Sequence, residues 1–149
     1  MQTSNDNTPT HSNASSFCCI CIFSALYEPH VGGVETYTKG IANALVKKGH
    51  RVIVVTNNTD NALEQESAKG IEIVRLPCSP LLNGRFPLSK KYASSDALWK
   101  WLDSQAVDHV VVNTRFYPLS ILGLKFARKK GIEPVLIEHG SETPLWTFR

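Results

Sequence analysis

The feature of this sequence that most restricts its fold is a strand–loop–helix–strand pattern near the amino terminus. Residues 17–23 and 51–56 are largely apolar runs without alternation, which is typical of strands covered on both faces of a parallel sheet. Residues 34–48 lie between these runs and have apolar residues at helical spacing. Gly32 and Gly33 come directly before this predicted helix. The pattern predicts a βαβ crossover with a glycine pair where the first strand passes into the helix.

The expected helix has a buried face and ends that suit its dipole. The side chains predicted by their spacing to face the sheet are Val34, Tyr37, Thr38, Ile41, Ala42 and Leu45. Glu35 lies in the first turn and Lys47 in the last, where each charge is opposite to the partial charge of that helix end. Gly49 is expected to end the helix in the left-handed conformation.

Apolar runs and helical patterns continue to alternate along the chain. Three further strands are predicted, over residues 71–76, 107–113 and 134–137. Two helices are predicted between them, one that starts near Ser94 and one with an apolar stripe that starts at Leu119.

This alternation predicts an α/β fold with a doubly wound, mostly parallel Rossmann-like sheet and helices on both faces. The expected strand order, numbered along the chain, is 3-2-1-4-5. Residues 58–70 and 78–93 are rich in polar and turn residues and are predicted to be loops. Pro77 is predicted to end the third strand.

Length and composition favour one globular domain over residues 17–149, preceded by a disordered polar tail over residues 1–16. The shares of 42% hydrophobic and 19% charged residues are typical of a soluble protein, and a net charge of +3 does not indicate a nucleic-acid partner. Residues 2–16 contain no Lys or Arg, so the apolar run that follows reads as a buried strand rather than a signal peptide.

The cysteines are Cys18, Cys19, Cys21 and Cys78. Adjacent cysteines in a strand point to opposite faces, so Cys18 and Cys19 do not suit one metal site. We interpret the four as small core residues in a reducing cytoplasm.

The expected sheet has a ligand position beyond the carboxyl ends of its first and fourth strands, where the strand order reverses. This position brings together the loop at Gly32 and Gly33, the corner at residues 113–115 and the strand end at residues 138–140. Candidate functional residues are therefore sought in these three segments.

Gly32 and Gly33 leave backbone N–H groups available to an anion at the positive end of the helix dipole, so a phosphate site is predicted. The alternative is that these glycines only permit a tight turn. The segment lacks the spacing of the dinucleotide fingerprint, and residues 56–58 (Thr-Asn-Asn) stand where a nicotinamide site expects an acidic residue. A dehydrogenase is therefore disfavoured.

His139 is a candidate catalytic residue because it ends a strand at the mouth of the crevice, beside Glu138. The alternative is a structural hydrogen-bond donor, which is how we interpret His109 at the opposite end of its strand. His30 lies in the glycine loop with weaker support. Arg115 has two open assignments, neutralising an anionic substrate or pairing with Glu138.

Residues 81–92 mix apolar and basic side chains in a segment expected to be a loop. Packing of this segment against the domain is the first interpretation. The alternative is contact with anionic lipid or with a lipid-linked acceptor.

Two sets of residues, in order and spacing, are similar to a known family. The first is Gly32-Gly33-Val34-Glu35 before a helix, followed by Lys48-Gly49-His50-Arg51-Val52 entering a strand. The second runs from Val107-Asp108-His109-Val110-Val111 to Glu138-His139-Gly140. Together they span most of residues 17–140 and resemble the amino-terminal part of glycosyltransferase family 4.

The resemblance implies a GT-B architecture, two Rossmann-like domains facing each other across a cleft, and transfer of a sugar from a nucleotide sugar with retention of configuration. It implies that Gly32 and Gly33 contact the donor diphosphate and that His139 contacts the transferred sugar as the catalytic residue. The loops of this half, with Asn113, Arg115 and Glu138, are expected to hold a glycan or lipid-linked acceptor. No metal or other cofactor is expected.

In that family a second domain carries most of the donor site, and nothing in residues 1–149 replaces it. The chain is therefore expected to be the amino-terminal portion of such an enzyme, inactive alone and located in the cytoplasm or at the inner face of the membrane. The alternative is a stand-alone acceptor-binding subunit that docks with a separately encoded donor domain. A weaker interpretation is a generic nucleotide-binding Rossmann module.

Overall fold

The structure is a computed structural model that describes residues 17–81, 86–89 and 93–139. In chain order its elements are β1 (Cys19–Ser24), α1 (Gly33–Lys47), β2 (Arg51–Asn58), β3 (Gln65–Ala68), β4 (Ile71–Leu81), β5 (Phe86–Ser89), α2 (Ala93–Ser104), β6 (His109–Asn113), α3 (Pro118–Lys130) and β7 (Val135–Ile137). The predictions for residues 1–16 and 140–149 lie outside the described residues.

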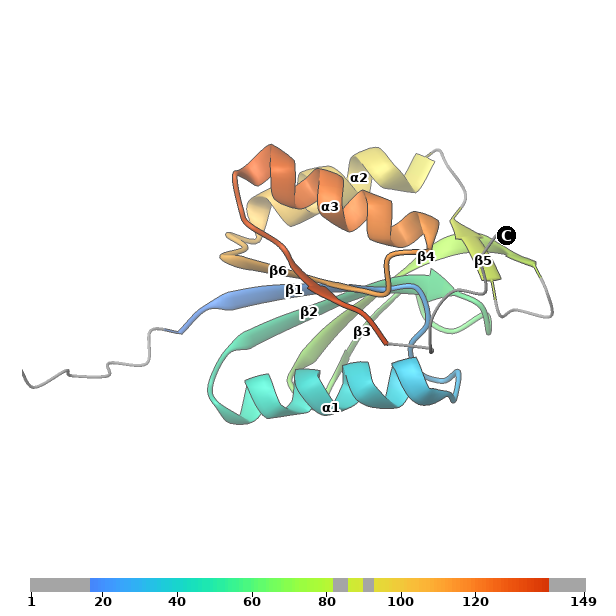
Figure 1. The fold of residues 1–149 in the computed structure, drawn as a ribbon, viewed down its shortest axis with the longest axis horizontal. Coiled ribbons are helices and arrows are strands. Elements are labelled where there is room, and N and C mark those ends of the chain that lie inside the picture. Colours follow the sequence, from blue (N-terminus) through green and yellow to red (C-terminus); the bar gives the residue numbers. More distant parts are fainter. Residues whose placement is uncertain (1–16, 82–85, 90–92, 140–149) are drawn as a thin grey trace, which may run out of the picture.

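A mostly parallel sheet with the order β3-β4-β2-β1-β6-β7 forms the centre of the fold, and β5 pairs with β4. Strands β4, β2, β1, β6 and β7 are parallel neighbours. Helix α1 covers one face of the sheet, and α2 and α3 cover the other (Figure 1). The five parallel strands of the described residues are those predicted from the sequence, and their order is the predicted 3-2-1-4-5.

The side chains of β1 alternate between two cores, one on each face of the sheet. Cys21 and Phe23 pack with Phe126 on the side of α2 and α3. Ile22 packs with Ala42 on the side of α1. Burial of β1 along its whole length explains why its sequence is continuously apolar, and Cys19 and Cys21 are free, buried residues as predicted.

Helix α3 approaches β1 closely at Gly123, where an added Cβ would lie 2.7 Å from Cγ of Phe23. Phe23 is fully buried, so its ring has little room to move. We expect Gly123→Ala to lower the free energy of unfolding by about 1–3 kcal/mol, as overpacking does.

The matched control is Gly40→Ala in α1, because no atom lies within 4 Å of a Cβ added there. That variant should be neutral or more stable by up to about 1 kcal/mol, the helix preference of alanine over glycine. Urea denaturation compares the two variants, and equal unfolding free energies would contradict this account of the packing between α3 and β1.

Two segments that the sequence predicts to be loops contain strands. Strand β3 lies within residues 58–70 and pairs antiparallel with β4, and β5 lies within residues 78–93 and pairs antiparallel with the end of β4. The prediction that Pro77 ends a strand is also wrong, because β4 continues to Leu81. Its outer part pairs with β5, with Pro80 opposite Pro87, and such a short ladder away from the main sheet tolerates residues that lack an N–H.

Helix α1 has the predicted extent, and Gly49 after it is left-handed, with φ of +90°. The predicted buried face is wrong at two positions. Tyr37 is 46% exposed, whereas Glu35, expected only to suit the dipole, is 4% exposed. Helix α1 is therefore rotated so that Glu35, Thr38 and Ala42 are its buried residues.

Across the part of the chain that the structure describes, no helix combines the length and the apolarity that crossing a bilayer requires.

Candidate functional site

The carboxyl ends of β1, β6 and β7 meet at one edge of the sheet. Ser24 lies opposite Asn113, and Asn113 lies opposite Ile137, the last residue of β7. This register brings together the loop before α1, the corner after β6 and the end of β7, as the strand-order argument predicts. Of the third segment, Gly140 lies outside the described residues.

The start of α1 exposes its backbone N–H groups. Gly32 is the N-cap residue in an extended conformation, and no side chain makes a capping hydrogen bond. The N–H groups of Gly33 and Val34 have no hydrogen-bond acceptor among the described residues. These amides stand at the positive end of the helix dipole and are available to an anion.

The two glycines differ in what surrounds them. A Cβ added at Gly32 would lie 2.5 Å from Oε2 of Glu35, whereas a Cβ added at Gly33 would meet no atom within 4 Å. A side chain at Gly32 would therefore have to displace the Glu35 carboxylate, whereas Gly33 faces open space. Gly33 also lies one helical turn before Tyr37, on the same side of α1.

Glu35 is a residue of this edge that the sequence analysis assigned only to the helix dipole. Its buried carboxylate contacts Nδ1 of His30 at 2.7 Å, across the loop that contains Gly32. The pair joins His30, before the two glycines, to Glu35 in the first turn of α1, and so holds the glycine loop against the helix. A Glu three residues after a glycine N-cap, preceded by a nearby histidine, was the signal in the sequence.

Arg75 of β4 also fixes this loop, and the sequence analysis missed it. Its guanidinium is buried in β4, and Nη2 donates to the carbonyl oxygen of Glu28 at 2.9 Å. Nη1 donates to the carbonyl oxygen of Leu63 at 2.9 Å and to Oε2 of Glu66 at 2.8 Å. One arginine therefore joins the β1–α1 loop, the β2–β3 loop and β3, and the signal for it was a charged residue inside an apolar strand.

A line of polar side chains runs through the buried edge from β1 to His139. Ser24 Oγ lies 3.1 Å from Oγ1 of Thr38, and Nδ2 of Asn113 donates to the same Thr38 oxygen at 2.5 Å. On its other side, Oδ1 of Asn113 lies 2.7 Å from Nε2 of His139. The ring of Tyr37 packs edge-on against the imidazole, with ring centroids 4.7 Å apart. The structure thus places His139 against Asn113, a predicted neighbour, and against Tyr37 of α1, which was not predicted to lie there.

The corner after β6 is strained and charged. Thr114 has φ of +66°, a left-handed conformation that is uncommon for threonine and that often occurs at functional corners. Of the two assignments open for Arg115, the structure has the pair with Glu138, whose Oε1 lies 3.5 Å from Nε of the arginine and accepts from its backbone N–H at 3.2 Å. The Arg115 side chain is 60% exposed, so it remains accessible to a ligand.

Helix α3 also begins at this edge, with Tyr117 as its N-cap residue. Burial, and then the negative charge of Glu35, raise the pKa of the Tyr117 phenol, so the starts of α1 and α3 influence each other. The Tyr117 ring stacks on Phe86 of β5, with centroids 5.3 Å apart. At Phe86 the segment 81–92 packs against the domain, while residues 82–85 and 90–92 lie outside the described part.

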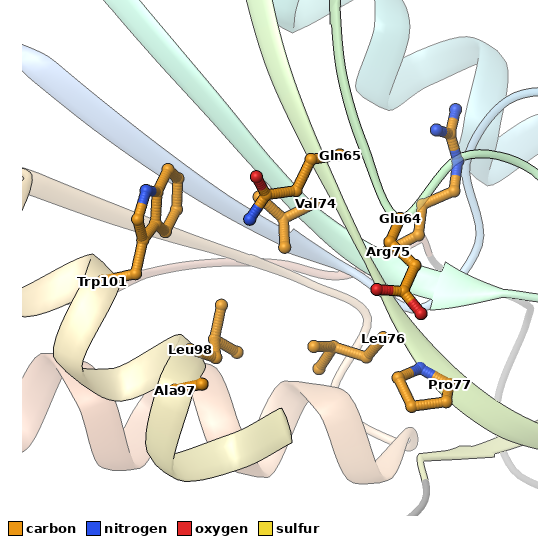
Figure 2. A pocket seen from close by; sticks show the side chains of 9 residues that line it. All are labelled: Glu64, Gln65, Val74, Arg75, Leu76, Pro77, Ala97, Leu98 and Trp101. Carbon is orange, nitrogen blue, oxygen red and sulfur yellow. The ribbon is translucent and has the colours of Figure 1, made fainter. Parts of the chain in front are cut away.

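A separate hollow of about 200 Å³ lies between α2 and the margin formed by β3 and β4. Figure 2 shows Leu98 and Trp101 of α2 across from Val74 and Leu76 of β4, with the guanidinium of Arg75 directed away from these apolar side chains. None of the residues lining this hollow is a predicted site residue. The candidate site is therefore an open edge of the domain and not this hollow.

The sheet and its flanking helices define a Rossmann-like domain, of which a GT-B architecture has two, and the polar edge lies where the strand order reverses. Sucrose-phosphate synthase from Thermosynechococcus elongatus has a similar fold, with a TM-score of 0.54 and 18% identity over 83% of this chain and 33% of that chain. Residues 31–149 match the family model for Glycosyltransferase Family 4. The chain belongs to this family, which confirms the resemblance seen in its sequence.

Two curated relatives match shorter parts of the chain. An uncharacterized 42.6 kDa protein in the cps region of Klebsiella pneumoniae is 33% identical over 56% of this chain and 22% of its own length. A subunit of the phosphatidylinositol N-acetylglucosaminyltransferase of Homo sapiens is 24% identical over 80% of this chain and 25% of its own length. The chain thus spans about a quarter of the length of these relatives.

Proposed function

We propose that this chain is the amino-terminal, acceptor-side portion of a retaining glycosyltransferase that transfers a sugar from a nucleotide sugar to a glycan or lipid-linked acceptor. The observation that carries the proposal is the juxtaposition at the start of α1. Within the described residues the amides of Gly33 and Val34 have no acceptor, and the open space at Gly33 lies one turn before Tyr37, whose ring contacts His139. A helix start with available amides, one turn from a contact with an imidazole, suits a sugar joined to a diphosphate.

In the proposed reaction, the bond between the anomeric carbon of the sugar and the diphosphate oxygen breaks, and a bond to an acceptor hydroxyl oxygen forms on the same face. The acceptor hydroxyl gives its proton to the departing diphosphate oxygen, and a nucleoside diphosphate leaves. The N–H groups of Gly33 and Val34 would stabilise the negative charge that develops on the departing diphosphate. His139 would contact the transferred sugar. No metal or other cofactor is required by this scheme.

The acceptor is proposed to lie against the corner of Asn113 and Arg115 and the strand end at Glu138. The exposed guanidinium of Arg115 suits an anionic acceptor, and Glu138 keeps it in place through the pair described above. The human relative acts, by its name, on phosphatidylinositol, which supports a lipid-linked acceptor. Leu81 and Leu88 are 46% and 36% exposed, and we propose that they contact the cytoplasmic face of a membrane.

The donor half of the site is proposed to be supplied by further polypeptide, in cis or in trans. Val135 and Leu136 of β7 are 58% and 43% exposed, and the outer edge of β7 pairs with no described strand. An apolar, unpaired sheet edge favours coverage by more polypeptide. The alternative of a separately encoded donor domain is favoured by the word subunit in the name of the human relative.

The reading frame after codon 149 tests these two arrangements. A second βαβ domain encoded in the same frame supports the arrangement in cis, and a stop codon beside a gene for the missing half supports docking in trans. If neither a second domain nor a neighbouring gene is found, and calorimetry shows that the chain alone binds uridine diphosphate tightly, both arrangements are wrong. The chain is then better explained as a generic nucleotide-binding module.

Replacing His139 with alanine in the complete transferase is expected to lower the rate of sugar transfer by roughly 10²-fold, because a group that contacts the reacting sugar is lost. The unfolding free energy of the chain should fall by only about 1 kcal/mol, the value of one hydrogen bond. Release of nucleoside diphosphate measures transfer, and urea denaturation measures stability.

The control is His109→Ala, because His109 is exposed at the opposite end of β6. It should leave both measurements nearly unchanged. If His139→Ala lowers stability and rate by comparable free energies, His139 is a structural residue and its catalytic assignment is wrong.

A further inference from the structure

We propose that Asn113 is a positioning residue that fixes the tautomer of His139, with the proton on Nε2 and the lone pair on Nδ1. The tautomer follows from hydrogen bonds within the described residues and does not depend on any activity. Its use in sugar transfer rests on the function proposed above.

The first step concerns the Thr38 hydroxyl, which has one proton to donate. Thr38 Oγ1 lies 2.8 Å from the carbonyl oxygen of Val34, one turn earlier in α1, and a carbonyl oxygen only accepts. The neighbouring Ser24 hydroxyl lies 2.9 Å from the carbonyl oxygen of Leu26 and 3.1 Å from Thr38 Oγ1, and its own proton can go to either. With its proton on the Val34 carbonyl, Thr38 meets Asn113 with a lone pair in both cases.

The second step concerns the orientation of the Asn113 amide, which is 1% exposed. Because Thr38 accepts, the amide nitrogen Nδ2 must face it, at 2.5 Å. The carbonyl oxygen Oδ1 then faces His139, at 2.7 Å from Nε2. The reversed amide would place two acceptors against each other at Thr38, in a buried position where no water compensates.

The third step concerns the imidazole itself. An amide oxygen only accepts, so Nε2 of His139 must carry a proton. A neutral imidazole has one N–H, which leaves a lone pair on Nδ1. Nδ1 has no hydrogen-bond partner within residues 17–139 as far as they are described, and the Tyr37 ring packs edge-on against the imidazole and limits its rotation.

The consequence for the site is a division of roles between its two polar groups. A neutral His139 with its lone pair on Nδ1 accepts a hydrogen bond, so it would bind a sugar hydroxyl and not a phosphate oxygen. The amides at the start of α1 donate hydrogen bonds and would bind the phosphate. Thr38 influences which imidazole nitrogen of His139 carries the proton, although it acts through Asn113 and makes no direct hydrogen bond to His139.

The test is nitrogen-15 spectroscopy of the imidazoles in the 149-residue chain at about pH 8.5, roughly two units above the ordinary pKa of histidine. The chain has five histidines, and the spectrum of His139→Gln identifies the signals of His139. We expect a ratio of Nε2–H to Nδ1–H tautomer of roughly 10:1 or more in the unaltered chain, from the cost of one unmade buried hydrogen bond.

Three variants test whether the hydrogen bond between Thr38 and Asn113 sets the tautomer of His139. Thr38→Val should lower the tautomer ratio several-fold, and Thr38→Ser, which keeps the hydroxyl, should restore it. Thr36→Val is the matched control, because the Thr36 hydroxyl donates to the carbonyl oxygen of Gly32 on the exposed side of the same helix and should leave the ratio unchanged. If Thr38→Val does not fold, Asn113→Ala provides the same comparison.

A dominant Nδ1–H tautomer or an equal mixture in the unaltered chain would overturn the inference, as would a ratio that none of the Thr38 or Asn113 variants changes. These results are independent of the proposed function. If the complete protein transfers no sugar, the transferase assignment is wrong, but the tautomer result still holds. If transfer is intact and the tautomers of His139 are mixed, only the present inference is wrong.

Discussion

Gly33→Val in the complete transferase is expected to reduce sugar transfer by roughly 10²-fold or more while the domain remains folded. A valine side chain at this position would occupy the open space over the first amides of α1, where the donor diphosphate is proposed to bind. Apart from the backbone of α1 itself, no atom of the described residues lies within 4 Å of the added Cβ, so the packing seen in the structure is not disturbed. The rate of nucleoside diphosphate release measures the effect, and thermal unfolding of the chain measures the fold.

Gly40→Val is the matched control because Gly40 lies in the same helix and is also surrounded by open space. It introduces the same side chain away from the site, so transfer should stay near the unaltered rate. Unchanged turnover in Gly33→Val would show that no phosphate approaches this helix end. Equal losses of activity in both variants would show that the effect arises from the helix and not from the site.

Arg75→Met is expected to lower the free energy of unfolding by about 3 kcal/mol, because it removes a buried guanidinium together with its charge-assisted hydrogen bonds to the carbonyl oxygens of Glu28 and Leu63 and to Glu66. Methionine matches much of the length and volume of arginine, so lost packing contributes little. The same variant should speed hydrogen exchange at the amides of His30 and Thr36, which donate to the carbonyl oxygens of Tyr27 and Gly32, since Arg75 holds the loop through the carbonyl oxygen of Glu28. Urea denaturation and amide exchange measure the two effects.

Arg51→Met provides the comparison at the surface. Arg51 also makes a two-point contact with a carboxylate, to Glu72 at 2.7 and 3.0 Å, but its side chain is 42% exposed. Its loss should cost about 1 kcal/mol or less, the usual value of an exposed pair. If the two variants are equally stable, the burial of Arg75 does not hold the loop in place.

The parallel strands could be predicted from the sequence because burial on both faces restricts composition along their whole length. Strand β2, for example, is buried from Val52 to Asn57, and its first four buried residues are all apolar. Strand β3 could not be predicted in this way. Its side chains are exposed or half-buried at every position, and pairing of its backbone with β4 defines it as a strand.

The position of the candidate site could also be predicted, because topology alone places the carboxyl ends of β1, β6 and β7 at one edge. The contacts within the site could not. The hydrogen bond between Thr38 and Asn113 joins residues 75 positions apart, and it depends on the rotation of α1 that buries Glu35 and exposes Tyr37. Helical spacing alone cannot fix that rotation when a polar residue finds a buried partner such as His30.

The sequence by itself determined the alternation of strands and helices, the order of the parallel strands, the glycine pair before α1 and the family to which the chain belongs. These properties depend on local periodicity and on chirality, which each segment carries in its own residues. Only the tertiary structure decided that Gly33 and not Gly32 faces open space, that Arg75 holds the loop, and that Asn113 joins Thr38 to His139. Such contacts depend on which side chains meet after the helices have packed on the sheet, and no segment contains that information alone.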